Sequence, residues 1–452
     1  MQILVLIWIK LLCGDVMQSR REKPIIGFAS SMFQTSGPRC GHSNWTDDAL
    51  IGNVPDSTQA IPHWDNFEAD LDLMEQAGAE TYRVSIEWSH VEPVQGQFDE
   101  AVLAQYGRLI DACLIRGIKP MLTLYHFNEP SWFTQLGGFE TEANITHFTA
   151  YCSRVFETLS PKVSLWCTIN EPAVQAYMGY FLGKFPPHIK LSFSKTAEVL
   201  KNFLKAHVDV YELLKAKPNG PESQIGIVHN FLRFKPLYWF DPIAYVITNL
   251  FNPITNNLVM EFFETGRFDY RLGGIHYRDD RAPNANDFIG LNFYANPIVG
   301  PNRKNIYGPT CRDGQVMGDM YLPLDPDGFA EAIDEVARLG KPIYITETGI
   351  ADNSDVLRQQ LLPMYFNVVK TKIAQGINIP GVYFWSGWDN YEWNEGSTKS
   401  FGFFDANRTP RPSVGILTQL IHDKNNPPPV IPHAEDNELD GKEDRPLLGA
   451  TI

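Results

Sequence analysis

The stretch Trp166-Cys167-Thr168-Ile169-Asn170-Glu171-Pro172 begins as a short apolar run and ends in an amide, a carboxylate and a proline. The apolar run is typical of a buried strand, and the proline stops regular strand pairing. A carboxylate at the exit of a buried parallel strand is where a barrel fold would present a reactive group. Residues 342–349, Pro-Ile-Tyr-Ile-Thr-Glu-Thr-Gly, repeat the pattern around Glu347. We therefore predict that Glu171 and Glu347 face each other across one pocket.

Short apolar or β-branched runs of the same kind recur along the chain, with helical patterns between them. They span residues 24–29, 80–86, 119–125, 163–169, 225–230, 287–293, 342–346 and 381–386. Strands that alternate with helices indicate βαβ units and a parallel sheet. Eight such units in one chain favour a closed barrel over an open sheet. We predict an α/β fold, a single (β/α)8 TIM barrel with its active site at the C-terminal ends of the strands.

The predicted barrel spans residues 24–424, and a segment of different composition flanks it on each side. Residues 1–23 form an N-terminal extension, read either as a weak signal peptide or as a dispensable leader. The apolar run in this extension is too short to span a membrane. The protein is expected to be cytoplasmic, or secreted if this run acts as a signal peptide. Residues 425–452 are rich in proline and acidic residues and lack aromatics, which predicts a disordered tail.

Composition excludes several classes of partner. The 452-residue chain has 44% hydrophobic residues and a net charge of −15, which fits a soluble globular protein and argues against nucleic-acid binding. The six cysteines form no CxxC or Cys/His cluster, so buried reduced thiols are favoured over disulfides and no metal site is indicated. No glycine-rich phosphate loop follows the first predicted strand, so no nucleotide cofactor is indicated.

Polar and aromatic side chains follow most of the predicted strands. Taken singly, each has a structural explanation: His126 could be a satisfied core histidine, Trp385 a core residue and Arg83 a buried ion-pair partner. Together they form a ring of amides and carboxylates with tryptophans between them. Amides and carboxylates match sugar hydroxyls, and indole faces match the apolar side of a pyranose. The ring comprises Gln34, Arg83, Glu87, Trp88, His126, Asn128, Asn170, Glu171, Asn292, Tyr294, Glu347, Trp385, Asp389, Asn390, Glu392 and Trp393.

These motifs resemble glycoside hydrolase family 1, the β-glucosidase family. Residues 168–172 (TINEP) and 345–349 (ITETG) resemble its two signatures. Residues 27–37, 63–93, 124–128, 290–294 and 384–393 resemble further family segments in the same order. The resemblance extends from about residue 24 to residue 420.

The resemblance implies a retaining mechanism, in which two carboxyl groups lie about 5–5.5 Å apart. Glu347 would attack the anomeric carbon. Glu171 would protonate the leaving oxygen and later deprotonate water, so its pKa must be raised while Glu347 stays ionised. Arg83 and Tyr294 would keep Glu347 ionised. The implied substrate-binding residues are Gln34, His126, Asn170, Asn292, Tyr294, Trp385, Glu392 and Trp393.

The predicted function is hydrolysis of O-linked β-glycosides of an unphosphorylated sugar, because a carboxylate at Glu392 would repel a phosphate. The predicted partner is a small carbohydrate or glycoside, with no cofactor, no nucleic acid and no stable membrane span. Departures from the family at Phe127, Asn128, Thr348 and Gly387 leave the leaving-group preference open. Two alternatives also remain open: a family-like barrel that only binds carbohydrate, and one that transfers the sugar to an acceptor other than water. The glycone, the aglycone and the oligomeric state stay open as well.

Overall fold

Eight parallel strands close into a barrel in the computed structural model, which describes residues 23–301 and 307–425. Around the barrel the strand order is β1, β13, β12, β9, β5, β4, β3 and β2. The strands are β1 (Ile25–Ser30), β2 (Thr81–Ser85), β3 (Lys119–Tyr125), β4 (Leu165–Asn170), β5 (Gln224–Asn230), β9 (Phe288–Phe293), β12 (Ile343–Thr348) and β13 (Gly381–Trp385). Each overlaps one of the eight predicted runs, so the predicted barrel is confirmed.

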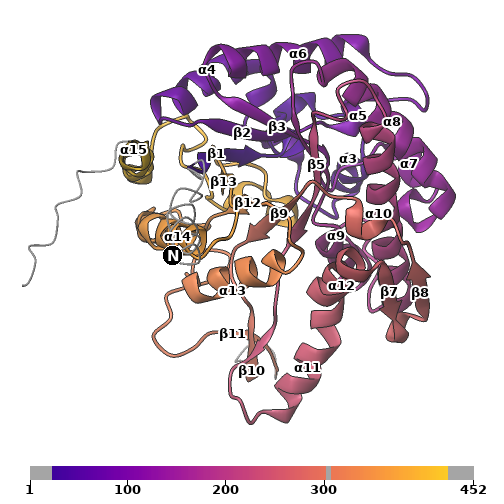
Figure 1. Ribbon diagram of the computed structural model, residues 1–452, viewed down its shortest axis with the longest axis vertical. Helices are drawn as coiled ribbons and strands as arrows, with labels where there is room; N and C mark the ends of the chain where they lie inside the picture. Colours follow the sequence, from indigo (N-terminus) through magenta and orange to yellow (C-terminus); the bar gives the residue numbers. More distant parts are fainter. Residues whose placement is uncertain (1–22, 302–306, 426–452) are drawn as a thin grey trace, which may run out of the picture.

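Helices surround this barrel on its outside (Figure 1). The longer ones are α4 (His63–Gln76), α6 (Glu100–Ile115), α8 (Ile145–Leu159), α10 (Phe193–Lys215), α11 (Pro242–Asn252), α12 (Leu258–Thr265), α13 (Pro326–Ala337), α14 (Val356–Ala374) and α15 (Pro412–Asn425). Shorter helices lie in the loops that follow the strands: α2 (Met32–Thr35), α3 (Asn44–Leu50), α5 (Trp88–Val91), α7 (Ser131–Gln135) and α9 (Pro172–Tyr180).

Helix α6 shows how the sequence sets an element and its face. The Asp99 carboxylate accepts hydrogen bonds from the first backbone N–H groups of the helix, as a good N-cap does. Its apolar residues recur at helical spacing, so Tyr106, Leu109, Ile110 and others are buried against the barrel. Gly117 follows at φ +70°, a conformation that ends the helix and lets β3 begin.

The core has two layers, one on each side of the strands. Large aliphatic and aromatic side chains fill the space between the strands and the outer helices. A smaller cluster fills the barrel interior, so the barrel is packed and not a pore. Its members include Ala29, Met121, Leu165, Cys167, Val228, Phe288, Tyr344 and Tyr383. Because side chains fill the interior, a ligand site of the barrel lies at an end of the strands and not within it.

Two long connections between barrel strands, in which the sequence shows no strand of the barrel, contain regular structure of their own. Residues 238–253 include helix α11, which begins where Asp241 caps the N–H groups of Ile243 and Ala244. Residues 297–326 include β10 (Ile298–Pro301) and β11 (Tyr307–Thr310), which form a small sheet with β6 (Lys235–Pro236). The prolines and aromatics in these stretches hid the helical and strand patterns.

The predicted leader and tail lie outside the described residues, apart from Lys23 and Asn425. Helix α15 runs to Asn425, and the predicted bounds of the leader, the barrel domain and the tail stay predictions. The five cysteines that the structure describes are free, and Cys113, Cys152 and Cys167 are buried. In residues 23–301 and 307–425, no helix has the length and apolar character that crossing a membrane requires.

Candidate active site

Glu171 lies directly after β4 and is 5% exposed. Its backbone is left-handed, with φ +46°, an unusual conformation for a residue with a side chain, and Pro172 begins α9 immediately afterwards. Strain of this kind persists where the surroundings hold it, often at functional sites. The Glu171 carboxylate accepts hydrogen bonds from the side-chain amides of Asn292 at 2.6 Å and Asn230 at 2.9 Å. Two neutral donors therefore hold this carboxyl.

Glu347 lies on β12, which β9 and β5 separate from β4, and it is 3% exposed. Its Oε1 accepts from Nη1 of Arg83 at 2.6 Å, and its Oε2 accepts from the Tyr294 hydroxyl at 2.8 Å. Arg83 comes from β2 on the far side of the barrel and is 1% exposed, so its charge requires this partner. Glu347 is thus fixed at both oxygens, once by a cation.

Asn170 and Asn292 join the two carboxyl groups into one network. The Oδ1 of Asn170 accepts from Nη2 of Arg83 at 2.7 Å and from Nδ2 of Asn292 at 3.2 Å. Asn292 donates to Glu171 as well, so contacts run from Glu347 through Arg83, Asn170 and Asn292 to Glu171. Thr346 fixes the Asn292 amide by donating to its Oδ1 at 2.7 Å. Strands β2, β4, β9 and β12 therefore converge on one site.

The environments of the two carboxyl groups shift their pKa values by different causes. Burial, followed by the charge of Glu347, raises the pKa of Glu171 to about 8. Burial also raises the pKa of Glu347, but Arg83 and the Tyr294 hydroxyl oppose that rise. The arrangement favours a proton on Glu171 and a charge on Glu347.

His126 extends the network toward the open side of the site. Its Nε2 faces the Asn170 amide at 3.2 Å, and that amide donates because its oxygen already accepts from Arg83. Burial and the nearby Arg83 charge hold the pKa of His126 well below its ordinary value, so the ring is neutral with its proton on Nδ1. This Nδ1 is buried and has no hydrogen-bond partner in the described part of the chain. A donor is therefore left for a bound molecule.

Gln34 and Glu392 form a second polar group beside Tyr391. Gln34 is fully buried and its Nε2 donates to the backbone oxygen of Tyr391 at 2.8 Å and to the Glu392 carboxylate at 3.5 Å. Within residues 23–301 and 307–425, its Oε1 has no hydrogen-bond partner. Burial and the charge of Glu347 raise the pKa of Glu392 to about 8. Because the charges of Glu347 and Glu171 both act on the Glu392 carboxyl, Glu392 lies close to the two catalytic candidates.

Aromatic rings border these polar groups. Trp385 stacks on the His126 ring, with centroids 5.7 Å apart and planes 22° apart. Trp393 stacks on the same ring from a centroid distance of 6.0 Å. Behind Trp393 lie Phe33 and Trp45, which hold it in place. Apolar ring faces next to hydroxyl-binding groups are the surfaces that sugars require.

The match to a known family follows this geometry. A family model described as Glycosyl hydrolase family 1 matches residues 40–270 and 276–425. The chain belongs to glycosyl hydrolase family 1. It is similar to the solved beta-glycosidase from Pyrococcus horikoshii, at 32% identity and a TM-score of 0.79 over 89% of this chain and 95% of that one. A β-glucosidase from Exiguobacterium antarcticum gives 26% identity and a TM-score of 0.82 over 90% and 99%. Among sequences, Beta-glucosidase 47 of Arabidopsis thaliana is 27% identical over 88% of this chain and 84% of its own.

Family membership supports a glycosidase with a carbohydrate substrate. The contacts above join Gln34, Arg83, His126, Asn170, Glu171, Asn292, Tyr294, Glu347, Trp385, Glu392 and Trp393 of the predicted ring. Trp88 instead packs on Phe133 and Tyr151 in the outer core, and Asp389 pairs with Arg411. Sequence reasoning missed Asn230, whose amide contacts Glu171. The available signal was its position at the end of the fifth strand, where no polar residue had been assigned. In the part of the chain that the structure describes, no group of three or more His, Cys, Asp or Glu side chains could hold a metal ion.

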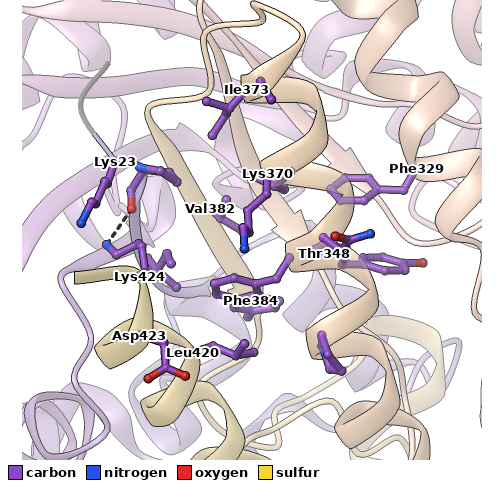
Figure 2. A pocket seen from close by; sticks show the side chains of 18 residues that line it. Lys23, Phe329, Thr348, Lys370, Ile373, Val382, Phe384, Leu420, Asp423 and Lys424 are labelled. Carbon is purple, nitrogen blue, oxygen red and sulfur yellow. Dashed lines mark hydrogen bonds between the residues drawn. The ribbon is translucent and has the colours of Figure 1, made fainter. Parts of the chain in front are cut away.

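The residues that depart from the family pattern have different surroundings. Phe127 packs on Trp393, with centroids 5.2 Å apart, so it supports the site wall. Asn128 accepts a hydrogen bond from Ser89 at 3.0 Å. Thr348 points away from the site and lines a mostly apolar cleft of about 700 Å³ between β12, β13, α14 and α15 (Figure 2). Gly349 passes so close to Trp385 that a Cβ would lie 2.2 Å from its backbone oxygen, which explains a glycine after the second signature.

Proposed function

We propose that the protein is a retaining β-glycosidase that hydrolyses O-linked β-glycosides of an unphosphorylated sugar through a glycosyl-enzyme intermediate. The observation that carries this proposal is the contrast between two buried carboxyl groups in one network. Glu347 is paired with Arg83 and Tyr294, whereas Glu171 is held by neutral amides and has a pKa raised to about 8. A fixed anion and a proton donor are the two groups that double displacement requires.

In the first step, Glu347 attacks the anomeric carbon and forms a glycosyl ester while Glu171 gives its proton to the departing oxygen. In the second step, Glu171, now ionised, takes a proton from water as the water oxygen attacks the same carbon. The Glu347 ester bond breaks and the carboxylate is restored. Asn170 lies between the two groups, where it would contact the sugar 2-hydroxyl, a contact that strengthens in the transition state.

The proposed glycone carries no phosphate. Glu392 and Gln34 border the site, and an acidic side chain offers a sugar phosphate no favourable partner. Arg83 is a cation of the site, but its guanidinium already donates to Thr123, Thr346, Asn170 and Glu347. The unpaired Gln34 Oε1 and His126 Nδ1 are the polar atoms that hydroxyl groups would satisfy.

The test is turnover of a panel of nitrophenyl β-D-glycosides, with the products followed by NMR. We expect a β-anomer as first product and loss of kcat on the order of 10³-fold or more in Glu347→Gln. Incubation with a 2-fluoroglycoside should label the peptide that contains Glu347. Full activity in Glu347→Gln, or an α-anomer as first product, contradicts the proposal. Binding without turnover in the wild type would favour a carbohydrate-binding barrel, and dominant transfer to added alcohols would favour a glycosyl transferase.

A further inference from the structure

A second cleft, of about 420 Å³, lies beside the end of β3. It is bounded by α3, α9, α10 and the 3₁₀ turn η3 (Gly138–Glu140). None of Glu171, Glu347 and Glu392 lines it, so it is distinct from the glycosidase site. Helix α9 separates the two, since it begins directly after Glu171 and presents Gln175 to this cleft.

Gln175 brings an unsatisfied acceptor to the cleft. The residue is 5% exposed, and its Nε2 makes one long hydrogen bond, 3.5 Å, to the Pro186 oxygen. Its Oε1 is buried and has no hydrogen-bond partner among the residues that the structure describes. A buried amide oxygen loses its hydration without compensation, which is costly unless a bound molecule supplies a donor. The side chain therefore indicates a ligand with N–H or O–H groups.

The charge of the lining is acidic. Asp47 and Asp48 from α3, Glu129 after β3, and Glu140 from η3 all line the cleft, and among residues 23–301 and 307–425 no lysine or arginine does. His188 also lines it but is hydrogen-bonded to Asp48 at 2.7 Å, and Lys195 meets Glu140 at 2.7 Å from outside the lining. The local field therefore favours a cation and disfavours an anion.

Glu129 is a buried carboxyl for which the proposed reaction has no use. It is 8% exposed and accepts from the Thr134 hydroxyl at 3.0 Å. Burial raises its pKa to about 7, so the group changes charge near neutrality. A bound cation would stabilise its ionised form.

The remaining surface of the cleft is apolar and aromatic. Phe139, Val199 and Phe203 line it, and the rings of Phe139 and Phe203 lie with centroids 4.3 Å apart. Tyr125 and Tyr180 add ring faces next to the carboxyl groups. Such a surface suits a hydrocarbon chain that ends in a cationic head. No group of three or more acidic or histidine side chains in the described residues converges as metal ligands, so the arrangement favours an organic cation over a metal ion.

We propose that the cleft between α3, α9 and α10 binds a small organic ammonium ion whose apolar carbon chain lies on Phe139 and Phe203. The ammonium group donates to the Glu129 carboxylate and to Gln175 Oε1. The site is independent of the glycosidase reaction, because none of the groups that hold the cation takes part in that reaction.

The test is calorimetric titration of the full chain at pH 8 with 1,5-diaminopentane, and with 1,5-pentanediol as the neutral probe of similar length. We expect one site for the diamine and at least about tenfold weaker binding of the diol. Diamine binding should weaken about tenfold or more in Glu129→Gln and in Gln175→Leu. Equal binding of the two probes, or no diamine binding, overturns the proposal.

Two further variants locate the bound amine. The matched control is Glu392→Gln, which removes a carboxyl from the glycosidase site and should leave diamine affinity unchanged. If Glu392→Gln abolishes binding while Glu129→Gln does not, the amine binds among the catalytic carboxyl groups and the proposal is wrong. Asp47→Asn changes a partly exposed residue of the cleft. It still tests the site if the substitution at buried Glu129 or Gln175 prevents folding. We expect severalfold weaker binding in Asp47→Asn, and unchanged affinity there counts against the site.

Discussion

Glu171 and Glu347 are chemically identical side chains with similar burial, and their partners alone assign them different roles. Glu171 accepts from two neutral amides, whereas Glu347 faces a guanidinium. We predict that Glu171→Gln lowers kcat/KM for an alkyl β-glycoside by about 10²–10⁴-fold, the usual contribution of a general acid. A nitrophenyl glycoside should lose much less, since nitrophenolate leaves without a proton. Comparing kcat/KM for the two substrates checks this, and an equal loss for both would contradict the role of Glu171 as proton donor.

The raised pKa of Glu171 gives a pH dependence with a defined sign. Below pH 8 the group is protonated and competent as an acid, and above pH 8 it loses the proton. We therefore expect kcat/KM for an alkyl glycoside to fall as pH rises through about 8. The fall should be absent in the residual activity of Glu171→Gln, because the amide does not titrate in this range. If the fall at high pH persists unchanged in the variant, a group other than Glu171 causes it.

Arg83 supplies the charge that keeps Glu347 ionised, so substitutions there should move the acidic limb of the profile. Arg83→Lys keeps a positive charge but loses the guanidinium group, whose separate N–H groups donate to Thr123, Asn170 and Glu347. We expect a lower kcat and an acidic limb shifted to higher pH.

Tyr294→Phe removes one hydrogen bond to the Glu347 carboxylate, worth about 1.5–3 kcal/mol, and should lower kcat about 10–150-fold. A full pH profile of each variant measures both effects, and an unmoved acidic limb in both would be inconsistent with this assignment.

Residue-scale sequence reasoning singled out both carboxyl groups as candidates because each follows an apolar strand within a recognisable motif. It also named Arg83 and Tyr294 as partners of Glu347, and the structure places both in contact with that carboxylate. It could not supply Asn230. That contact joins the ends of two neighbouring strands, and its existence depends on the left-handed backbone at Glu171. No local sequence pattern predicts the direction in which the left-handed backbone points the Glu171 side chain.

At the scale of the element, β12 positions a side chain of its neighbour β9. The Thr346 hydroxyl donates to Asn292 Oδ1 and so directs the Asn292 NH₂ group toward Glu171. We predict that Thr346→Val lowers kcat about tenfold and raises the pKa of the basic limb, because Glu171 then loses a hydrogen bond that favours its ionised form. The pH profile of kcat/KM measures the shift.

The matched control is Thr348→Val, two residues further along the same strand. Thr348 faces the outer cleft between α14 and α15 (Figure 2), and no described residue forms a hydrogen bond with its hydroxyl. This variant should keep the wild-type profile. If both valine variants lower activity equally, a general disturbance of β12 is responsible and not the orientation of Asn292.

Element positions in the barrel were predictable to within a few residues, whereas loop structure was not. The barrel strands are buried on both faces, so each reads as a continuous apolar run. Helix α11 shows the opposite case. Its exposed face carries Ile243, Tyr245 and Val246 in place of charged residues, so the alternation of apolar and polar faces that marks a helix is missing.

At the scale of the whole molecule, buried titratable groups set how stability responds to pH. Glu129, Glu171 and Glu392 have pKa values raised to about 7, 8 and 8 in the folded protein, against an ordinary value of 4.5. Between pH 6.5 and 8 the folded state therefore holds protons that the unfolded state has lost. Since the unfolded state binds fewer protons, the free energy of unfolding falls as pH rises through this window.

Two buried histidines act with the opposite sign at lower pH. Burial lowers the pKa of His207 to about 3 and that of His229 to about 4, so below pH 6.5 unfolding takes up protons and stability falls with acid. Between pH 4.5 and 6.5 the carboxyl and histidine effects oppose each other. Above pH 6.5 the carboxyl groups destabilise the fold as pH rises, and toward pH 8.5 the thiols of Cys113, Cys152 and Cys167, whose pKa values burial raises, act in the same direction. We predict that Tm declines from pH 6.5 to 8.5 and that Glu129→Gln makes this decline shallower, since the amide needs no proton to remain buried. Thermal unfolding followed by circular dichroism at half-unit pH steps measures the slope of Tm against pH for both proteins.

The control is Glu68→Gln, at an exposed carboxylate that pairs with Arg116, and it should leave this slope unchanged. A Tm that rises across this window would mean that these carboxyl groups are ionised in the folded protein.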